Sequence, residues 1–301
     1  MPSISRREAG KLIATGGAGL LAGVVVSRGR LSGARMIDSV VRGVEIGAQS
    51  YSFRDRPLAE AIKAYQTVGL GECELYAGHV EPDEKKTKRE ELRQWRLTVP
   101  LSQFHDIRQQ FDNAGVLLFA YNYSFRKDFT DPEIERGFEM AQALGVKYMT
   151  ASSNVSVAPR VDAFARKYKI MVGFHGHDDT RNPDEFSTPE TFARAMQGAS
   201  RYIGVNLDIG HFTAAGGDPV EYIRQHHDRI VTLHIKDRKK DHGPNMPFGQ
   251  GDTPIVAVLR LLRDEHWKIP ANIEYEYGKP GMDTIAEVKK CYEYCRKALE
   301  S

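Results

Sequence analysis

Short apolar runs rich in β-branched residues alternate with longer amphipathic segments from Val44 to the end of the chain. The runs have the length of buried strands, and the segments between them space their apolar residues as helices do. Strand and helix repeated eight times predict an α/β fold, a single (β/α)₈ TIM barrel. The eight predicted strands lie in EIGAQSYSF, GECELY, GVLLFAYNY, GVKYMT, KIMVGFHGH, IGVNLDIGH, IVTLHIKD and PANIEYEYG.

Several predicted helices begin with a capping residue followed by proline, a pair that satisfies free backbone N–H groups and pre-sets the first helical φ. These pairs are Asp131-Pro132, Thr188-Pro189, Asp218-Pro219 and Thr253-Pro254. An open, doubly wound sheet is the alternative fold, and it favours a glycine-rich phosphate-binding turn after the first strand. The segment QSYSFRDRP stands there instead. The pattern therefore favours the barrel.

Polar residues follow apolar ones at the ends of four consecutive predicted strands. They are His175 in VGFH, Asp208 in VNLD, His234 in VTLH and Glu274 in ANIE. Active sites of such barrels lie at the C-terminal ends of the strands, so we expect these side chains to meet at one height. Imidazole and carboxylate ligands suit one divalent ion, Mn²⁺, Co²⁺, Zn²⁺ or Mg²⁺. A metal-free hydrogen-bonded network is the alternative.

The motifs LDIGHF, LHIKD and IEYEYG, with IGAQSYSFRD and GQGDTP, resemble the xylose isomerase-like TIM-barrel superfamily of sugar isomerases and epimerases. The resemblance covers the chain from about Val44 onward. It implies a divalent metal held by position 175, Asp208, His234 and Glu274. Position 175 is His where the family has Glu, so the two-glutamate proton exchange of the family's epimerases does not carry over to this chain.

Three further residues are predicted to be catalytic. His177, two residues beyond the first predicted ligand, is expected to act as acid or base or to contact substrate. Lys236 shares a strand face with His234 and is expected to stabilise an enediolate oxygen or to neutralise a carboxylate, with a plain ion pair as the alternative. Glu276 shares the face of Glu274, and it becomes the metal ligand if the register differs by two residues.

Three residues are predicted to bind substrate. His211 follows Asp208 by one helical turn and resembles the family's D-x-x-H motif, in which the histidine contacts substrate. Glu74 lies at a polar rim position of the second strand, and Tyr121 belongs to a group of aromatic residues near strand ends. Each of them has a structural role as its alternative.

These residues suit the removal of a proton next to a carbonyl. We therefore expect a divalent-metal-dependent isomerase or epimerase that acts on a keto-sugar or sugar derivative through an enediolate. Elimination from a similar intermediate gives the alternative, a lyase or dehydratase on 3-keto-glycosides or related sugars. A non-catalytic sugar-binding barrel is a third possibility. An abasic-site endonuclease needs a zinc cluster with extra histidines on the second and third strands, where only His79 stands.

The segment SRREAGKLIATGGAGLLAGVVV resembles a twin-arginine export signal, with Arg6 and Arg7 ahead of a glycine-rich apolar stretch. That stretch is shorter than the roughly 20 residues of a membrane-spanning helix. We expect residues 1–34 to be the signal, residues 35–301 to be the barrel domain, and the mature protein to be periplasmic or otherwise exported. It should then have no stable insertion in the membrane. An uncleaved membrane anchor is the alternative.

The charge of the chain changes when the signal is set aside. The 301 residues carry 42 Lys and Arg against 40 Asp and Glu, a net charge of +2. Residues 1–34 hold five basic and one acidic residue, so 37 basic and 39 acidic residues remain. The slight excess of negative charge predicts no nucleic-acid partner. A small sugar is the expected partner, and a homo-oligomer is compatible with the sequence.

Two other features predict ordinary structure. The mixed charge run from Glu81 to Arg96 is expected to form a solvated helix. The cysteines Cys73, Cys291 and Cys295 are too few for a disulfide framework, and the last two, four residues apart in a predicted helix, are expected to pack in the core.

Overall fold

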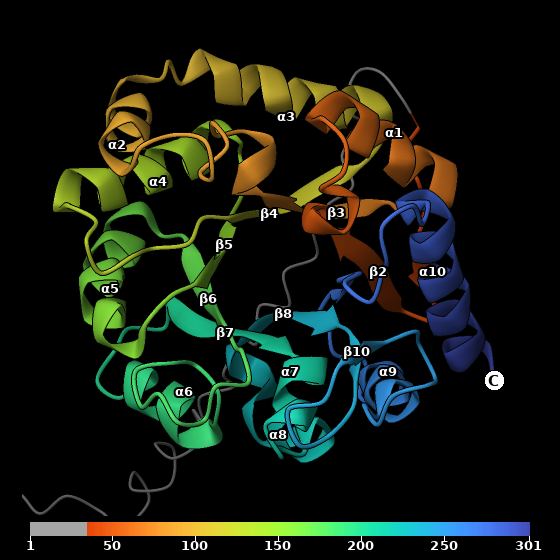
Figure 1. Cartoon of the computed structure of the whole chain (residues 1–301). Helices are drawn as coiled ribbons and strands as arrows, with labels where there is room; N and C mark the ends of the chain where they lie inside the picture. The colour runs from red at the N-terminus through yellow and green to blue at the C-terminus, as the bar shows by residue number, and fades with distance from the viewer. Residues whose placement is uncertain (1–34) are drawn as a thin grey trace, which may run out of the picture. The chain divides into compact units, whose positions relative to one another are not determined.

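The computed structural model describes residues 35–301; the predicted export signal, residues 1–34, lies outside the described residues. Eight parallel strands close into a barrel surrounded by helices (Figure 1), which confirms the predicted fold. Closure comes from β2, which pairs with β11 on one side and with β3 on the other. The barrel strands, each overlapping one predicted run, are β2 (Val44–Gln49), β3 (Glu72–Tyr76), β4 (Leu117–Asn122), β5 (Tyr148–Ser152), β6 (Met171–His175), β7 (Ile203–Asp208), β8 (Ile230–Ile235) and β11 (Ala271–Ile273).

Helices follow the strands and cover the outside of the barrel (Figure 1). The α-helices are α1 (Leu58–Val68), α2 (Arg89–Thr98), α3 (Ser102–Ala114), α4 (Asp131–Ala143), α5 (Ala158–Tyr168), α6 (Pro189–Met196), α7 (Ile209–Ala214), α8 (Pro219–His226), α9 (Ile255–Asp264) and α10 (Thr284–Glu300). The short elements are β1 (Val40–Val41), β9 (Asp237–Arg238), β10 (Asn245–Met246), η1 (Ser50–Phe53), η2 (Ala77–His79), η3 (Val155–Val157) and η4 (His227–Arg229). Within residues 35–301, none of the helices is both long and apolar enough to cross a bilayer.

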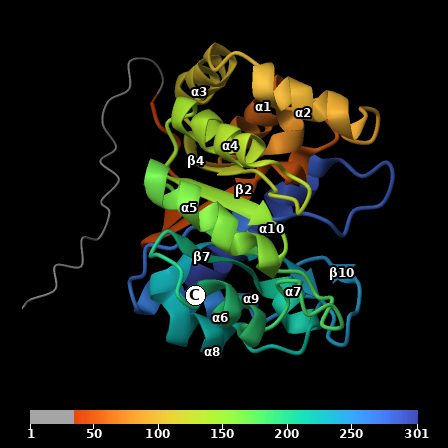
Figure 2. The same cartoon turned by 90° about the vertical axis from the view of Figure 1, so that its left-hand side faces the viewer.

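The loops that follow the strands lie together at one end of the barrel. Seen from the side, β10 and the long loop before α10 project from the same end (Figure 2). This is the C-terminal end of the strands, where a barrel of this kind carries its active site. The polar residues singled out from the sequence therefore belong to the functional end of the fold.

The helix starts follow the predicted capping chemistry with two differences. The side chains of Thr188 and Asp218 accept backbone N–H groups at the starts of α6 and α8, as predicted. Thr130, not Asp131, caps α4, and Asp131 is its first helical residue. The hydroxyl of Thr253 accepts a hydrogen bond from a backbone N–H of β9, so it does not cap α9.

The charge run before and within α2 is only partly the solvated helix that the sequence predicted: Glu90, Glu91 and Gln94 are exposed, but Arg96 is buried. Arg96 is 5% exposed, and its guanidinium binds both carboxylate oxygens of Glu81 at 2.5 and 2.9 Å. The cause is Glu133 on α4, which is fully buried and forms ion pairs with Arg89, Arg93 and Arg96. A carboxylate removed from water requires such partners.

The core lies in the layer between strands and helices, and the barrel interior is partly polar. Cys291 and Cys295 are buried free thiols on α10, which confirms their predicted packing role. Inside the barrel, the Asn272 amide donates to the Thr232 hydroxyl at 2.9 Å, and both side chains are fully buried. Further polar side chains lie inside the barrel toward the C-terminal ends of the strands, where the candidate site is.

Candidate metal centre

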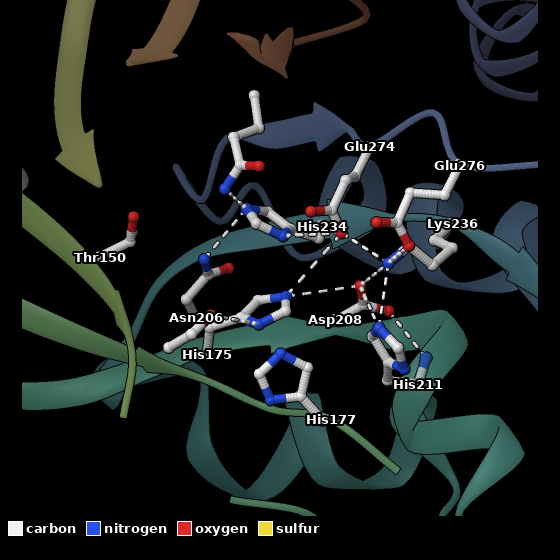
Figure 3. Close-up of polar contacts among 12 residues, drawn as sticks. Thr150, His175, His177, Asn206, Asp208, His211, His234, Lys236, Glu274 and Glu276 are labelled. Carbon is white, nitrogen blue, oxygen red and sulfur yellow. Dashed lines mark hydrogen bonds and ion pairs between the residues drawn. The ribbon is translucent and has the colours of Figure 1, made fainter. Parts of the chain in front are cut away.

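Four side chains from consecutive strand ends converge in the barrel. His175 ends β6, Asp208 ends β7, His234 is the fifth residue of β8, and Glu274 follows β11 directly. Each offers one ligand atom, and these atoms all lie within 4.8 Å of one another. All four residues are buried. Figure 3 shows the four side chains directed toward a common point, at the end of the barrel where the strands finish.

The facing atoms of this group form no hydrogen bond of suitable geometry, although Lys236 makes ion pairs with the two carboxylate oxygens. Among the described residues, no hydrogen bond reaches His175 Nε2, Asp208 Oδ2, His234 Nδ1 or Glu274 Oε2. Buried polar atoms left in this way are costly, and each needs an explanation. Two imidazole nitrogens and two carboxylate oxygens around one point are a donor set for a divalent ion. The residues present therefore fit the metal that the sequence predicted.

The strand ends also hold these ligands in place. Asp208 is the N-cap of α7, and its Oδ1 accepts the N–H of His211 at 2.7 Å. Its Oδ2 thus remains free to face His175 Nε2, 3.5 Å away. The backbone N–H of Glu274 donates to Ile235 at 3.1 Å, so Glu274 stays beside β8 after its own strand has ended. Oδ1 of Asp208 therefore caps the helix, and Oδ2 is the oxygen that faces the other predicted ligands.

Lys236 lies at the centre of three carboxylates. Its Nζ is 2.6 Å from Glu274 Oε2, 2.8 Å from Glu276 Oε2 and 3.0 Å from Asp208 Oδ2. Burial opposes the charge of Lys236, but the carboxylates raise its pKa above the ordinary value, so the ammonium form prevails. Burial likewise opposes ionisation of Asp208 and Glu274, while Lys236 lowers the pKa of each. Three carboxylates around one ammonium leave two negative charges, which a divalent cation balances.

Glu74 supports His234 from the side away from the convergence point. Its Oε2 lies 2.9 Å from His234 Nε2, while Gln49 and Thr150 donate to Oε1 at 2.8 and 2.5 Å. Burial alone would raise the pKa of Glu74, but His234 and these donors lower it. A carboxylate that binds the second nitrogen of a metal-binding histidine fixes the tautomer and orientation of the ring. Glu74 is fully buried behind His234. Its predicted contact with substrate stays a prediction.

His177 lies beyond His175 and is more exposed. Its side chain is 38% exposed, and the two ring centroids are 4.8 Å apart. His177 Nδ1 meets Glu185 Oε1 at 2.8 Å. Burial lowers the pKa of His177, but the bond to Glu185 and its charge raise the pKa above the ordinary value overall. His177 is therefore accessible and oriented, as a residue that contacts substrate must be.

His211 lies beside Lys236 and Asp208. Its Nε2 lies 3.0 Å from Lys236 Nζ, and its Nδ1 lies 3.2 Å from Asp178 Oδ1. Arg238 also reaches Asp178, at 2.8 Å, so Asp178 connects the loops after β6, β7 and β8. The arrangement holds the His211 ring next to the predicted ligand Asp208, with 3.9 Å between His211 Nε2 and Asp208 Oδ2.

Two other predicted site residues have different surroundings. Glu276 is 24% exposed at the side chain and pairs with Lys236; the converging group contains Glu274 instead. Tyr121 is fully buried and packs against Phe104 of α3, outside the barrel. Side chains alternate along a strand, so the next residue, Asn122, points into the barrel, where it donates to Thr150 at 3.1 Å. The position of Tyr121 does not support its predicted contact with substrate.

Sequence reasoning missed several residues that support the site. These residues are Gln49, Thr150, Asp178, Glu185, Asn206 and Arg238. Polar residues at inward positions of apolar strands were the available signal for Gln49, Thr150 and Asn206. No pattern marks Glu185, because its contact with His177 depends on how the loop after β6 folds.

The sequence profile described as xylose isomerase-like TIM barrel matches residues 62–295. The fold is similar to a sugar phosphate isomerase/epimerase from Parabacteroides distasonis, at TM-score 0.61 and 17% identity over 88% of this chain and 97% of that one. It is also similar to the IOLI protein with a binding zinc atom, at TM-score 0.63 and 16% identity over 85% and 98% of the two chains. A segment of 75 residues is 33% identical to the rhizopine catabolism protein MocC of Rhizobium meliloti; it spans 25% of this chain and 22% of that protein.

Proposed function

Since the chain belongs to the xylose isomerase-like TIM-barrel family, we propose that it is a divalent-metal-dependent enzyme of the sugar isomerase/epimerase type. Its substrate is a keto-sugar or a sugar derivative, and the reaction passes through an enediolate. One observation carries the proposal: four ligand atoms from consecutive strand ends converge in a buried site at the C-terminal end of the barrel. The zinc atom of the similar IOLI protein is consistent with it.

The metal would be held by His175, Asp208, His234 and Glu274. When bound, a divalent ion polarises neighbouring hydroxyl and carbonyl oxygens and makes the adjacent C–H more acidic. The chain's own residues supply the rest of the chemistry. The Lys236 ammonium stands 3.0 Å or less from two predicted ligands, where it stabilises negative charge that develops on a substrate oxygen.

Proton transfer falls to residues outside the ligand set. The contact between Glu185 and His177 Nδ1 leaves His177 Nε2 to accept a proton from substrate or return it. The second candidate base is the carboxylate of Glu276, which pairs with Lys236. Returning the proton to the same carbon gives epimerisation, and returning it to the neighbouring carbon gives isomerisation.

Elimination from a 3-keto-glycoside or a related sugar is the second candidate activity, and His175 favours it. An imidazole whose Nε2 faces the other ligand atoms has no lone pair left for a proton from substrate. The ligand set thus lacks the strand-five carboxylate that serves as a base in the epimerases this sequence resembles. A single-sided proton transfer is enough for elimination, whereas symmetric epimerisation needs a base on each face.

Isotope exchange tests the proposal. The metal-loaded protein is incubated in D₂O with a panel of keto-sugars and 3-keto-glycosides, and substrates are followed by NMR. We expect deuterium at a carbon next to the carbonyl, or release of a leaving group if the reaction is an elimination. Asp208→Asn should abolish either signal because the ligand set is broken. Sugar binding without exchange or product contradicts the proposal and indicates a non-catalytic sugar-binding barrel.

A further inference from the structure

A cavity of about 450 Å³ lies at the ends of β2, β3 and β4. The candidate metal ligands stand at the ends of β6, β7, β8 and β11, so the cavity occupies the other half of the same barrel face. Its volume falls within the roughly 300–1000 Å³ of small-molecule sites. Its lining includes Tyr51, Arg54, Tyr76, Asn122, Tyr123 and Arg126.

The cavity shares a wall with the candidate metal centre. Arg54 Nη1 donates to the carbonyl of Tyr275, the residue after Glu274, at 2.9 Å. The same guanidinium lies over the ring of Tyr51, 4.4 Å from its centroid. Burial raises the pKa of Tyr51, and the charges of nearby Glu276 and Glu274 raise it further, against the opposing charge of Arg54. Tyr51 thus stands between the two halves of the barrel face.

A second connection runs through the barrel interior. Asn122 lines the cavity, and its amide donates to Thr150 at 3.1 Å. Thr150 in turn donates to Glu74, which contacts His234. A residue that lines the cavity and a predicted metal ligand therefore belong to one hydrogen-bonded chain.

The lining indicates which chemical class the cavity takes. Arg126 pairs with Glu84 at 2.5 Å, and Arg96 pairs with Glu81 at the same distance. Arg54 instead donates to the backbone carbonyls of Tyr51 and Tyr275, and Lys85 is the fourth cation of the lining. The lining carboxylates Glu81, Asp83 and Glu84 offset most of this positive charge, which disfavours a phosphate as the preferred ligand. Aromatic rings beside hydrogen-bonding groups instead suit a ring with one apolar face and a polar edge. A sugar ring has that character.

Tyr76 is an aromatic residue of the lining whose ring position is fixed by its neighbours. Its ring meets Tyr51 edge-on, with 5.0 Å between centroids. A Cβ added at Gly78 would lie only 2.3 Å from the Tyr76 ring, so the ring occupies the space that a side chain at Gly78 would need. Tyr76 has no contact with the predicted metal ligands in the described contacts, and it is therefore a probe of the cavity alone.

We propose that this cavity binds a second sugar ring, so that the substrate is a keto-sugar unit joined to another sugar. The inference rests on the proposed function in one respect, since it assigns the keto unit to the metal group. The two units then span the barrel face, the reacting one over β6, β7, β8 and β11 and the other over β2, β3 and β4. The cavity sets specificity for the unit that does not react.

Matched ligands test the second subsite by binding alone. Zinc-loaded protein is titrated by calorimetry with fructose and with three glucosyl-fructoses, turanose, leucrose and isomaltulose. At least one glycoside should bind about tenfold more tightly than fructose, the size of a well-placed aromatic contact. Tyr76→Ala should reduce that ratio to near one while the dissociation constant for fructose and the zinc content stay unchanged. Tyr202→Ala, at the start of β7 and so at the opposite end of the barrel, is the matched control and should keep the ratio.

Three results overturn the proposal: no glycoside binds more tightly than fructose, Tyr76→Ala leaves the ratio intact, or fructose 6-phosphate binds more tightly than every glycoside. The last result would identify an anion site. The D₂O experiment tests the proposed function separately. If that function is wrong, neither deuterium exchange nor product is seen, and this result does not depend on Tyr76. If glycosides bind more tightly but no exchange occurs, the proposal of a second subsite stands and the proposed enzymatic function is rejected.

Discussion

Glu74 Oε2 lies 2.9 Å from His234 Nε2, and the opposite ring nitrogen, Nδ1, faces the convergence point of the candidate metal centre. One carboxylate on β3 therefore determines which nitrogen of a β8 histidine is free. Glu74 is itself held by Gln49 and Thr150, and all of these groups are buried. The orientation of a predicted ligand is thus set by residues on three other strands.

Glu74→Gln tests this relationship. The pKa of Glu74 is lowered by His234, so the substitution removes a negative charge and the fixed tautomer of His234. Loss of such a partner weakens metal binding by about 10-fold to 100-fold. Competition with a chromogenic chelator measures the change in zinc affinity.

Glu72→Gln is the matched control for Glu74→Gln. Glu72 lies two residues earlier on β3, is fully buried and has a pKa raised by burial and by neighbouring carboxylates. Both effects favour its neutral form, which the amide resembles. Zinc affinity should stay at the wild-type value. Equal losses in the two variants would show a general disturbance of the barrel interior and contradict the role assigned to Glu74.

The predicted ligands themselves are tested by metal content. Asp208→Asn and His234→Ala should each lose the ion because each removes one of four converging ligand atoms. The barrel should still fold, since most of the apolar core lies between strands and helices. Elemental analysis of purified protein gives the metal content, and circular dichroism checks folding. A full complement of metal in both folded variants would reject this ligand set.

The sequence was sufficient for the ligand group because of the periodicity of the fold. Asp208 and Glu274 each follow apolar strand residues, and a parallel barrel brings all strand ends to one face. Contacts between distant loops leave no such pattern. Asp178 and Arg238 meet only because the loops after β6 and β8 fold toward each other.

Two residues have surroundings that the local sequence does not reveal. Arg96 was expected on a solvated face, but Glu133 on another helix, 37 residues later, draws it inward. Tyr121 was expected near substrate, whereas the strand alternation gives the inward position to Asn122. A shift of one residue moves a side chain to the other face of a strand, and the apolar run around Tyr121 fits either choice.

The proposed export of the protein is tested by substitution in the signal, which lies outside the described residues. Arg6→Lys together with Arg7→Lys should leave the precursor at full length in the cytoplasm, because twin-arginine recognition requires both guanidinium groups. Arg28→Lys with Arg30→Lys, outside the motif, should be processed normally. Cell fractionation followed by immunoblotting distinguishes the two. Unchanged processing and location in the first variant would reject the twin-arginine interpretation.

Glu133 is expected to dominate the acid sensitivity of the fold near α4. Burial opposes its charge, but Arg89, Arg93 and Arg96 lower its pKa below the ordinary value. A carboxyl whose folded pKa is lowered stabilises the protein above its unfolded pKa of about 4.3, and the stabilisation disappears as the pH falls through the folded pKa. Glu133→Gln should cost about 3 kcal/mol at neutral pH, because three arginines lose a charged partner.

Urea denaturation at pH 7 and pH 3.5 measures this effect. The difference in stability between wild type and Glu133→Gln should be large at pH 7 and should shrink at pH 3.5, which lies below the ordinary Glu pKa of about 4.3, so that the carboxyl of the unfolded chain takes up a proton. Glu139→Gln on the same helix is the control: its ion pair with Arg136 is more exposed, and its loss should cost less than about 1 kcal/mol. A difference that stays constant with pH would contradict the role of Glu133.

His175 and His177 separate metal binding from proton transfer. His175 Nε2 belongs to the converging group, whereas His177 Nδ1 is bound to Glu185 and the ring is partly exposed. His175→Ala should therefore weaken zinc binding, and turnover should recover in part when zinc is added in excess. His177→Ala should keep its zinc but lose turnover by about 100-fold or more, the usual contribution of a general acid or base. Because Glu185→Gln keeps His177 and removes only the charge beside it, that variant should shift the pH–rate profile to lower pH without loss of metal. Zinc content and rate, measured on all three proteins, decide the assignment: if His177→Ala loses the metal and His175→Ala retains it, the roles of the two histidines are reversed.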